Sequence, residues 1–364
     1  MPPVPVGDGS PVVIQTMWKD RLSFSGLDRE TDRAVTERIE RLRAMGCGIL
    51  RFAVPDMDAA ETLGRLAALV SMPLVADIHF DYKIALRCLD FPIAKIRINP
   101  GNIGSREKVE TVLGKAAAKR IPIRIGVNAG SLPPDLRKQA DEGLSPAEAL
   151  VLAAERELAI FDDFGFSGVL VSLKASSVQE TIRANRLLAE KFPALPLHLG
   201  LTEAGPLVAG VVKNTAALVP LLAGGIGDTI RVSLSDTMEN EVLAAREILA
   251  AAAEIAGGAG NSAVARRLGQ GRGVSIVSCP RCGRSSFDTH AFTGRWLTRL
   301  YSLDKDITVA VMGCTVNGPG EARHADLGIT GAGDKALLFR RGKALRTIDA
   351  SEADAAFGEE LERL

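Results

Sequence analysis

The chain has 364 residues, and its 44 lysine and arginine residues balance 44 aspartate and glutamate residues, so the formal net charge is zero. This balance argues against an extended nucleic-acid-binding surface, and an aromatic content of 4% leaves few side chains on which bases could stack. No apolar run is long enough to span a bilayer, and the N-terminus lacks the basic and apolar regions of a secretion signal. We therefore expect a cytoplasmic protein that is long enough for two domains.

Between residue 12 and about residue 257, short apolar runs alternate with longer segments of helical spacing. We predict strands in the apolar runs at 12–17, 49–54, 74–79, 93–99, 121–128, 169–174, 197–202 and 229–234. We predict helices over 28–45, 57–70, 81–90, 105–120, 145–164, 177–192, 205–222 and 237–256. Eight successive units of about thirty residues predict a closed (β/α)8 TIM barrel, which we place at residues 1–257. An open doubly wound sheet is the alternative, but no Gly-x-Gly-x-x-Gly motif follows the first run.

A change in composition and spacing follows the predicted barrel. The residues at 256–261 are small and flexible, and we predict a linker at 258–264. Beyond the linker, strands are predicted at 274–278, 307–312, 327–329 and 336–339, with helices over 286–302 and from Ser351 onward. Residues 265–364 are therefore expected to form a small α/β domain.

Three of the five cysteines are spaced as Cys-x2-Cys-x31-Cys at Cys279, Cys282 and Cys314, and Glu321 follows seven positions after the last of them. Two thiols joined by a tight turn can bind one metal centre. The third thiol can reach that centre only by folding, so the pattern requires a compact domain.

Three kinds of site fit this spacing. A disulfide is disfavoured because the cysteine count is odd and no secretion signal is present. A structural zinc site could recruit His290 or His324, whereas an iron–sulfur cluster could combine three thiolates with one unusual ligand. The glycine-rich run at 313–320 favours the cluster, because small residues let the backbone approach a bulky group and direct amides at its sulfur atoms. The other two cysteines, Cys47 and Cys88, lie in apolar stretches and are expected to be core residues.

Polar side chains are concentrated at the carboxyl ends of the predicted barrel strands, where barrels of this type carry out their chemistry. Five basic residues occupy these ends on five different strands: Arg51, Arg97, Arg124, Lys174 and Arg231. The same ends also supply a set of uncharged or acidic polar residues: Asp77, His79, Asn99, Asn128, Ser176, His198, Glu203 and Ser233. A single arginine in a strand more often forms a structural ion pair, but five cations at equivalent positions with few acids nearby favour an anion such as a diphosphate. The turn at 99–104 either adds backbone amides to such a site or is a plain strand–helix turn.

The segments at 279–284 (CPRCGR) and 313–322 (GCTVNGPGEA) closely resemble motifs of the 4-hydroxy-3-methylbut-2-enyl diphosphate synthase family, and the resemblance covers nearly the whole chain. This family performs the reductive, iron–sulfur-dependent step of non-mevalonate isoprenoid biosynthesis, and its members have a barrel in the same place. The resemblance implies a 4Fe–4S cluster bound by Cys279, Cys282, Cys314 and Glu321. It also implies an oxidoreductase of the short bacterial type, with flavodoxin or ferredoxin as electron donor.

The substrate implied by the resemblance is 2-C-methyl-D-erythritol 2,4-cyclodiphosphate, which is opened to an allylic diphosphate with loss of one hydroxyl as water. Its diphosphate is expected on Arg51, Arg97, Arg124, Lys174, Arg231 and Ser233. The resemblance places Asp77, His79 and Asn128 in the lining of the site and Glu203 close to the substrate carbons. We expect Glu203 to be the acid–base residue, because a hydroxyl leaves more easily once it is protonated. His79 is a second candidate, for which a packed, hydrogen-bonded histidine is the alternative.

The assignment of Glu321 as a catalytic residue rests on its oxygen ligand, which binds iron more weakly than a thiolate and can be exchanged. A homodimer with active sites shared between subunits is expected, because the helix at 237–256 delivers the chain to the far end of the barrel.

Two other functions remain open from the residues alone. One is a zinc-stapled barrel that acts as an aldolase or isomerase on a sugar phosphate. The other is a non-catalytic redox sensor that uses the cluster and leaves the basic residues unexplained.

Overall fold

A computed structural model describes residues 4–21, 29–269, 273–315, 320 and 322–364 of the chain. It consists of two compact units, Met1–Gln270 and Gly271–Leu364, which we call the barrel unit and the sheet unit. The division falls later in the chain than the linker expected at 258–264. The physical reason is Arg267, whose guanidinium donates to the carbonyl oxygens of Ser10, Gly225 and Gly227 and pairs with Asp228, so that this segment is fastened to the barrel.

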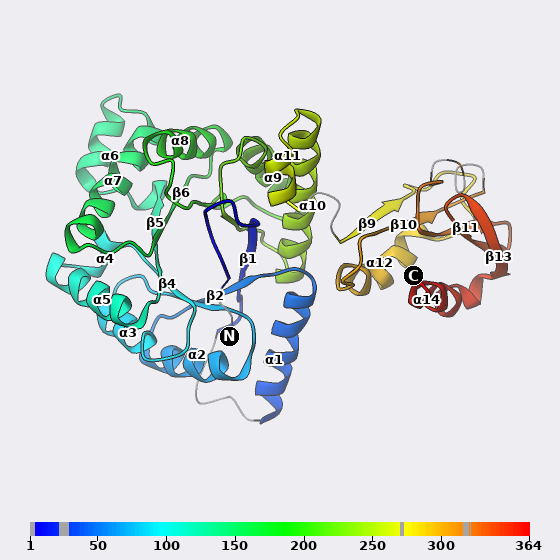
Figure 1. Ribbon diagram of the computed structural model, residues 1–364, viewed down its shortest axis with the longest axis horizontal. Coiled ribbons are helices and arrows are strands. Elements are labelled where there is room, and N and C mark those ends of the chain that lie inside the picture. Colours follow the sequence, from blue (N-terminus) through cyan, green and yellow to red (C-terminus); the bar gives the residue numbers. More distant parts are fainter. Residues whose placement is uncertain (1–3, 22–28, 270–272, 316–319, 321) are drawn as a thin grey trace. The chain divides into compact units, whose positions relative to one another are not determined.

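Eight parallel strands form the barrel unit (Figure 1). They are β1 (Val13–Met17), β2 (Ile49–Ala53), β3 (Leu74–Asp77), β4 (Lys95–Ile98), β5 (Ile123–Asn128), β6 (Val169–Lys174), β7 (His198–Leu199) and β8 (Thr229–Ile230). Neighbours follow the order β6-β5-β4-β3-β2-β1-β8-β7, and a parallel bridge between Val171 and Leu197 joins the two ends of this series. The prediction of a closed (β/α)8 barrel is therefore confirmed.

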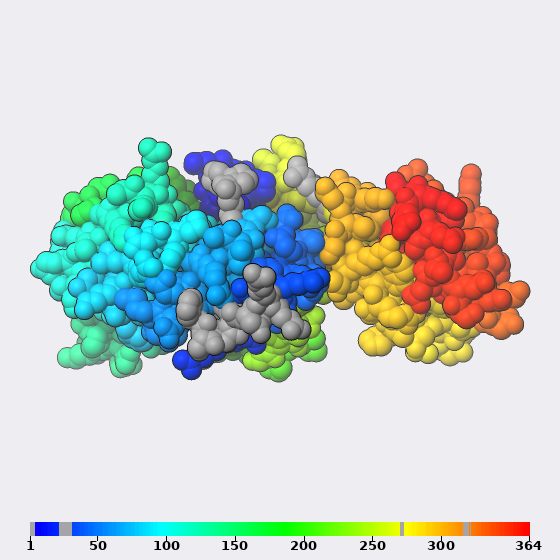
Figure 2. All heavy atoms as spheres, turned by 90° about the horizontal axis from the view of Figure 1, so that it is seen from below, coloured from blue at the N-terminus to red at the C-terminus, as the bar shows by residue number. Residues whose placement is uncertain are grey.

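Helices alternate with the strands and cover the outside of the barrel (Figure 1). They are α1 (Arg29–Ala44), α2 (Met57–Leu69), α3 (Tyr82–Cys88), α5 (Arg106–Lys119), α7 (Pro146–Phe164), α8 (Val178–Lys191), α9 (Leu207–Ala223) and α10 (Met238–Gly258). Helices α2, α3 and α5 pack in sequence along one flank, and their side chains contribute to a continuous blue-to-cyan surface in Figure 2. None of the described helices combines the length and apolar character that crossing a membrane requires.

Among the described residues of the barrel unit, four further elements were not expected from the sequence. They are α4 (Pro100–Ile103), the 3₁₀ turn at Ala129–Ser131, α6 (Pro134–Asp141) and α11 (Ser262–Arg267). Pro100 and Pro134 each stand in the first turn of a helix, where a fixed φ and a missing amide hydrogen are tolerated. Short helices of this kind carry too few apolar residues to produce a recognisable period.

The inward and outward faces of the strands differ in chemistry, and this difference places the candidate site. Successive side chains of a strand point to opposite faces. Leu50 and Phe52 of β2 belong to the large apolar cluster of the barrel unit, whereas Arg51 between them lines a cavity at the mouth of the barrel. Cys47 and Cys88 also lie in this cluster, and burial raises the pKa of both thiols to about 12.

The sheet unit is built on five strands in the order β13-β12-β11-β10-β9. The strands are β9 (Val274–Ser278), β10 (Ile307–Met312), β11 (Leu327–Ala332), β12 (Lys335–Arg340) and β13 (Lys343–Asp349). Strands β9, β10 and β11 are parallel, and the last two pairings are antiparallel. Helices α12 (Thr289–Tyr301) and α14 (Ala353–Glu362) complete a core in which the rings of Phe292, Trp296 and Phe357 stack edge to face or in parallel.

Candidate active site

A cavity of about 280 Å³ lies at the carboxyl ends of the barrel strands. The structure brings together here the ten barrel residues that were assigned to the site: Arg51, Asp77, His79, Arg97, Arg124, Asn128, Lys174, Glu203, Arg231 and Ser233. Asn99, Ser176 and His198, which were also expected at the strand ends, do not line the cavity. We call this space the mouth cavity. Its lining also includes Met17, Ser172, Leu201 and Thr202, which were not predicted from the sequence. Ser172 stands two positions before Lys174 on the same strand, so the two-residue period of a strand could have identified it.

Arg124 lies deepest among the cations of the mouth cavity. Only 1% of its surface is exposed, and neither Nε nor Nη1 has a hydrogen-bond partner among the described residues. Burial lowers the pKa of Arg124 well below its usual value, and the nearby Arg51 and Arg97 lower it further. A guanidinium in this state gains hydrogen bonds and charge compensation when an anion enters the cavity.

Lys174 at the end of β6 is held by a histidine rather than by a carboxylate. Its Nζ lies 3.2 Å from Nε2 of His198, whose Nδ1 is 2.7 Å from the hydroxyl oxygen of Thr229. Burial lowers the pKa of Lys174 well below its usual value, and the charge of Arg124 adds to this effect. The pKa of His198 is also lowered by burial and by the surrounding cations. The imidazole is therefore neutral and can accept a hydrogen bond from the lysine.

Asp77 is the carboxylate inside the mouth cavity that holds several cations in place. Its oxygens lie 3.6 Å from Nε of Arg51, 3.2 Å from Nη1 of Arg97 and 3.4 Å from Nε2 of His79. Burial alone would raise the pKa of Asp77, but Arg51, His79 and Arg97 together hold it well below its usual range. Burial lowers the pKa of Arg51 to about 10 in spite of this pairing. His79 is half exposed, so it contacts this cluster while remaining open to the cavity.

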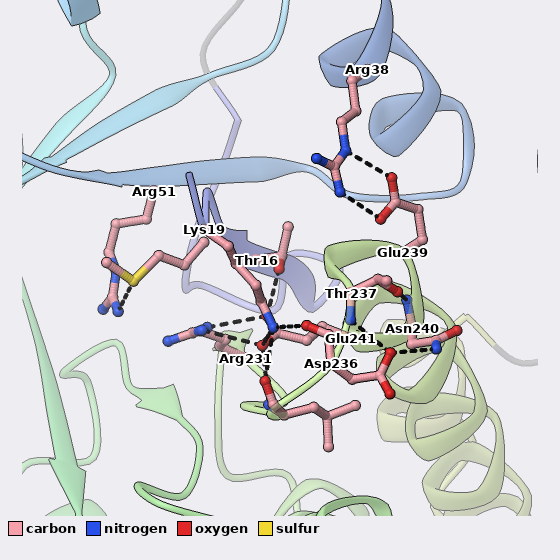
Figure 3. Close-up of polar contacts among 12 residues, drawn as sticks. Thr16, Lys19, Arg38, Arg51, Arg231, Asp236, Thr237, Glu239, Asn240 and Glu241 are labelled. Carbon is pink, nitrogen blue, oxygen red and sulfur yellow. Dashed lines mark hydrogen bonds and ion pairs between the residues drawn. The ribbon is translucent and has the colours of Figure 1, made fainter. Parts of the chain in front are cut away.

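A second buried carboxylate, Glu241 of α10, organises the side of the mouth next to β1 and β8 (Figure 3). It lies 3.2 Å from Nη2 of Arg231 and 3.0 Å from Nζ of Lys19. It also accepts hydrogen bonds from the hydroxyl of Thr16 at 2.6 Å and from the amide of Leu234 at 3.0 Å. The sequence gives no sign of this role, because a glutamate in the first turn of a helix is usually a solvated charge.

Two glycines give the cationic side chains the space that they occupy. A Cβ atom on Gly126 of β5 would lie 2.4 Å from Nε of Arg97, and Nη2 of the same guanidinium donates to the Gly126 carbonyl at 3.1 Å. A Cβ atom on Gly200 would lie 2.7 Å from Nζ of Lys174. Any larger residue at these positions would displace a cation from the mouth cavity.

Glu203 differs from the other acids of the site because it is exposed and forms no ion pair with a cation of the described residues. Its backbone adopts φ +53°, a left-handed conformation that is costly for a residue with a side chain. The residue lies in the loop after β7 and lines the mouth cavity. A strained backbone that presents a carboxyl group to a cavity is typical of a functional position.

The three motif cysteines occupy one edge of the sheet unit. Cys279 directly follows β9, and its amide donates to the carbonyl of Val311 on β10 at 2.9 Å. Cys314 lies two residues after the end of β10, and the loop that carries Cys282 is tied to the same edge by the Ser286 amide, which donates to Gly313 O at 2.9 Å. The backbone therefore brings all three thiols to the carboxyl ends of two adjacent parallel strands.

The three thiols fit an iron–sulfur group in the chemistry of their donor atoms, although the structure does not gather them around one point. All three thiols are exposed or half-buried, as ligands of a bound group must be before it arrives. In the described part of the chain, no three His, Cys, Asp or Glu side chains are gathered into a group that could hold a metal ion. Glu321, the fourth predicted ligand, lies outside the described residues.

Comparison with known proteins adds two matches to family models. Residues 1–246 match the GcpE TIM-barrel domain, and residues 275–363 match the GcpE protein C-terminal domain. These two matches together span both units and include the mouth cavity and the three cysteines.

Curated relatives extend over almost the whole chain. A protein of Treponema pallidum named 4-hydroxy-3-methylbut-2-en-1-yl diphosphate synthase (flavodoxin) is 51% identical, and the match covers 99% of this chain and 88% of the relative. Proteins with the same name from Treponema denticola and Thermodesulfovibrio yellowstonii are 49% and 43% identical. Both of these matches cover 99% of this chain, with 94% and 96% of the respective relatives.

Proposed function

This chain belongs to the GcpE family, and we propose on that basis that it is a 4-hydroxy-3-methylbut-2-en-1-yl diphosphate synthase. Its substrate would be 2-C-methyl-D-erythritol 2,4-cyclodiphosphate, bound in the mouth cavity. Two electrons and one proton enter, the bond between a ring carbon and one phosphate oxygen breaks, and a hydroxyl leaves as water. The product is an open-chain allylic diphosphate.

The observation that supports this function most strongly is the excess of buried positive charge in the mouth cavity. Five cations line it, and the described carboxylates that pair with them are Asp77 and Glu241. The side chains of Arg51, Arg97 and Arg124 all retain buried nitrogens without a hydrogen-bond partner among the described residues. A diphosphate supplies the missing charge and acceptor oxygens, and the same cations stabilise it as it becomes a leaving group.

The residues around the cations have separate tasks in this proposal. Asp77 and Glu241 hold Arg51, Arg97 and Arg231 in orientations that face the diphosphate. Glu203 donates a proton to the departing hydroxyl, because it is the acid that reaches the cavity without being neutralised by a cation. His79 orients the Asp77 and Arg97 pair and contacts the substrate side of the cavity, where Asn128 and Ser233 supply further hydrogen bonds.

The reducing group in this proposal is a 4Fe–4S cluster held by Cys279, Cys282 and Cys314, with Glu321 as fourth ligand. The backbone segments that carry the three cysteines are attached to the carboxyl ends of β9 and β10, and this shared location supports the ligand set. When bound, such a cluster supplies the electrons one at a time. A flavodoxin is proposed as the electron donor, following the names of the curated relatives.

We further propose a homodimer in which the sheet unit of one subunit serves the barrel of its partner. Helix α10 has 21 residues and therefore spans about 30 Å from its start near the mouth. It runs antiparallel to the strands, so the chain leaves the barrel at the end opposite the mouth cavity. A partner subunit provides a route for the three cysteines to reach a mouth cavity.

A single set of measurements tests the proposed function. Protein purified without oxygen should contain about four iron and four sulfide ions per chain. With reduced flavodoxin, it should convert the cyclic diphosphate to the open-chain allylic diphosphate. A single zinc ion per chain would instead indicate the zinc-stapled alternative. A cluster without turnover and without substrate-induced thermal stabilisation would indicate a sensor.

A further inference from the structure

A second cavity of about 700 Å³ lies at the other end of the barrel, where the strands begin. Its lining includes residues at the start of several strands, among them Ile49, Val75, Lys95, Pro122 and Val169. The N-terminal segment contributes Val4, Val6 and Asp8. None of the residues that line this cavity also lines the mouth cavity. We call it the basal cavity.

Lys95 is the unusual side chain of the basal cavity. It is the first residue of β4, it is only 4% exposed, and it has no hydrogen bond or ion pair with any described residue. A buried ammonium without a partner is costly, and proteins normally pair such groups. Burial lowers the pKa of Lys95 to about 7, and the charges of Arg124 and Arg51 contribute to this shift. Lys95 therefore shares an electrostatic environment with the floor of the mouth cavity.

The remaining lining defines what the basal cavity could hold. Most of it is apolar and comes from aliphatic side chains and prolines. Arg120 lies at this cavity, is exposed and has no ion pair with the described residues, and Asp8 is the one described carboxylate in the lining. The volume lies in the range of small-molecule sites, which are mainly apolar with a few polar groups that fix orientation. An apolar molecule with a single anionic head group matches both the walls and the unpaired lysine.

We propose that the basal cavity is an effector site for a small apolar monoanion, such as a medium-chain carboxylate, whose head group binds Lys95. An anion at Lys95 would lie below the cations that receive the diphosphate. The negative charges of this anion and of the diphosphate repel each other within the barrel interior. Occupation of the basal cavity therefore weakens substrate binding at the mouth, and substrate weakens effector binding by the same factor. This coupling rests on the proposed function, whereas effector binding itself does not.

Calorimetric titration of the full-length, cluster-loaded protein tests the site directly. The probes are octanoate and, as an uncharged molecule of the same length, 1-octanol. Octanoate should bind more tightly than 1-octanol, and Lys95→Met should weaken octanoate binding about tenfold or more, since it removes a charged hydrogen bond but keeps an apolar side chain. Lys213→Met, the same change at an exposed lysine on α9, should leave octanoate binding unchanged.

A second variant and a kinetic readout address the two parts of the proposal separately. Ala194→Trp places a large side chain at an exposed position of the cavity rim and should also reduce octanoate binding while leaving Lys95 in place. In wild type, saturating octanoate should raise the KM for the cyclic diphosphate about fivefold, and this rise should be absent in Lys95→Met.

The outcomes are distinguishable. Equal binding of octanoate to wild type and Lys95→Met, or equal binding of octanoate and 1-octanol, would overturn the effector site. Octanoate binding that depends on Lys95 but leaves the KM unchanged would retain the site and overturn the coupling. Lys95-dependent binding in a protein that does not turn over the cyclic diphosphate would support the site and contradict the proposed function.

Discussion

At the scale of single residues, Arg124 shows how the mouth cavity is prepared for an anion. It is buried beside other cations, and two of its nitrogens have no acceptor among the described residues. A buried guanidinium without a counter-ion lowers the stability of the folded protein. The same guanidinium favours substrate binding, because the diphosphate supplies the missing negative charge and hydrogen-bond acceptors. Stability and affinity should therefore respond in opposite directions when this side chain is replaced.

Arg124→Met should lower kcat/KM for the cyclic diphosphate about a hundredfold and raise the free energy of unfolding by about 1 kcal/mol. The methionine fills the space of the side-chain stem and removes the buried charge. Kinetics and thermal denaturation of the cluster-loaded protein measure the two effects, and cluster absorbance should not change. Arg186→Met, at an exposed position on α8, is the matched control. Unaltered kcat/KM in Arg124→Met would remove Arg124 from the diphosphate site.

Asp77 leads to a prediction about pH. Its pKa is held below the usual range in the folded protein, so its contribution to stability is present above the unfolded pKa of about 3.9 and is lost as the pH falls below that value. Asp77→Asn should therefore cost about 3 kcal/mol of unfolding free energy at pH 7 and less at pH 3. Urea denaturation at both pH values measures this difference.

Asp141→Asn, at an exposed position on α6, is the control for the same chemical change and should have little effect at either pH. A cost for Asp77→Asn that is the same at pH 3 and pH 7 would show that the pairing of Asp77 with Arg51 and Arg97 does not stabilise the folded state.

At the scale of elements, α10 contributes to the site from outside the barrel wall. Its first turn presents Glu241 to Arg231 and Lys19, and it also pairs Glu239 with Arg38 of α1 in a two-point contact of 3.0 and 3.2 Å (Figure 3). The two glutamates are two residues apart and therefore point in different directions. The first turn of α10 therefore has two roles: Glu239 joins it to α1, and Glu241 positions Arg231 at the mouth cavity.

Glu241→Gln should raise the KM for the cyclic diphosphate about tenfold and change kcat by less than about twofold, because Glu241 positions Arg231 without touching the substrate. Glu239→Gln should leave both constants unchanged, since its partner Arg38 does not line the mouth cavity. Steady-state kinetics of the two variants make the comparison. A KM rise of the same size in Glu239→Gln would mean that the effect comes from the stability of α10 rather than from Arg231.

The elements also differ in how well the sequence predicted them. The eight barrel strands and their main helices were predicted because each combines an apolar run with a helical repeat. Strand β13 was missed, since six of its seven side chains are exposed and no apolar alternation marks it. Helix α14 begins at Ala353 after a 3₁₀ turn rather than at the expected cap signal at Ser351. Short or exposed elements are specified by their neighbours more than by their own pattern.

At the scale of the whole molecule, the proposed shared active site can be tested by complementation. Cys282→Ser disables the cluster and Arg124→Met impairs the mouth cavity about a hundredfold, so each variant alone should have about one per cent of wild-type activity or less. Co-expression of the two should restore about a quarter of wild-type activity, because half of the randomly assembled dimers are mixed and each mixed dimer has one intact pair of units. Tagged subunits allow the mixed dimers to be isolated and assayed.

Co-expression of Arg124→Met with Lys174→Met is the control. Both changes lie in the barrel unit, so no combination of subunits contains an intact mouth cavity, and activity should not rise above that of the single variants. Inactive mixed dimers in the first experiment, or a fully active monomer, would contradict the shared site.

The sequence by itself determined the barrel, the strand ends that form the mouth and the spacing of the cysteines. These features depend on local periods, and the parallel strands of a barrel necessarily bring their carboxyl ends together. Only the tertiary structure decided that Glu241 serves Arg231, that Asp77 gathers Arg51 and Arg97, and that Lys95 is buried without a partner. Thr16 and Glu241 are 225 residues apart in the chain, and such partners are selected by closure of the barrel rather than by any pattern along the sequence. The charge state of a buried side chain depends on these distant partners, so it could not be predicted before the fold was known.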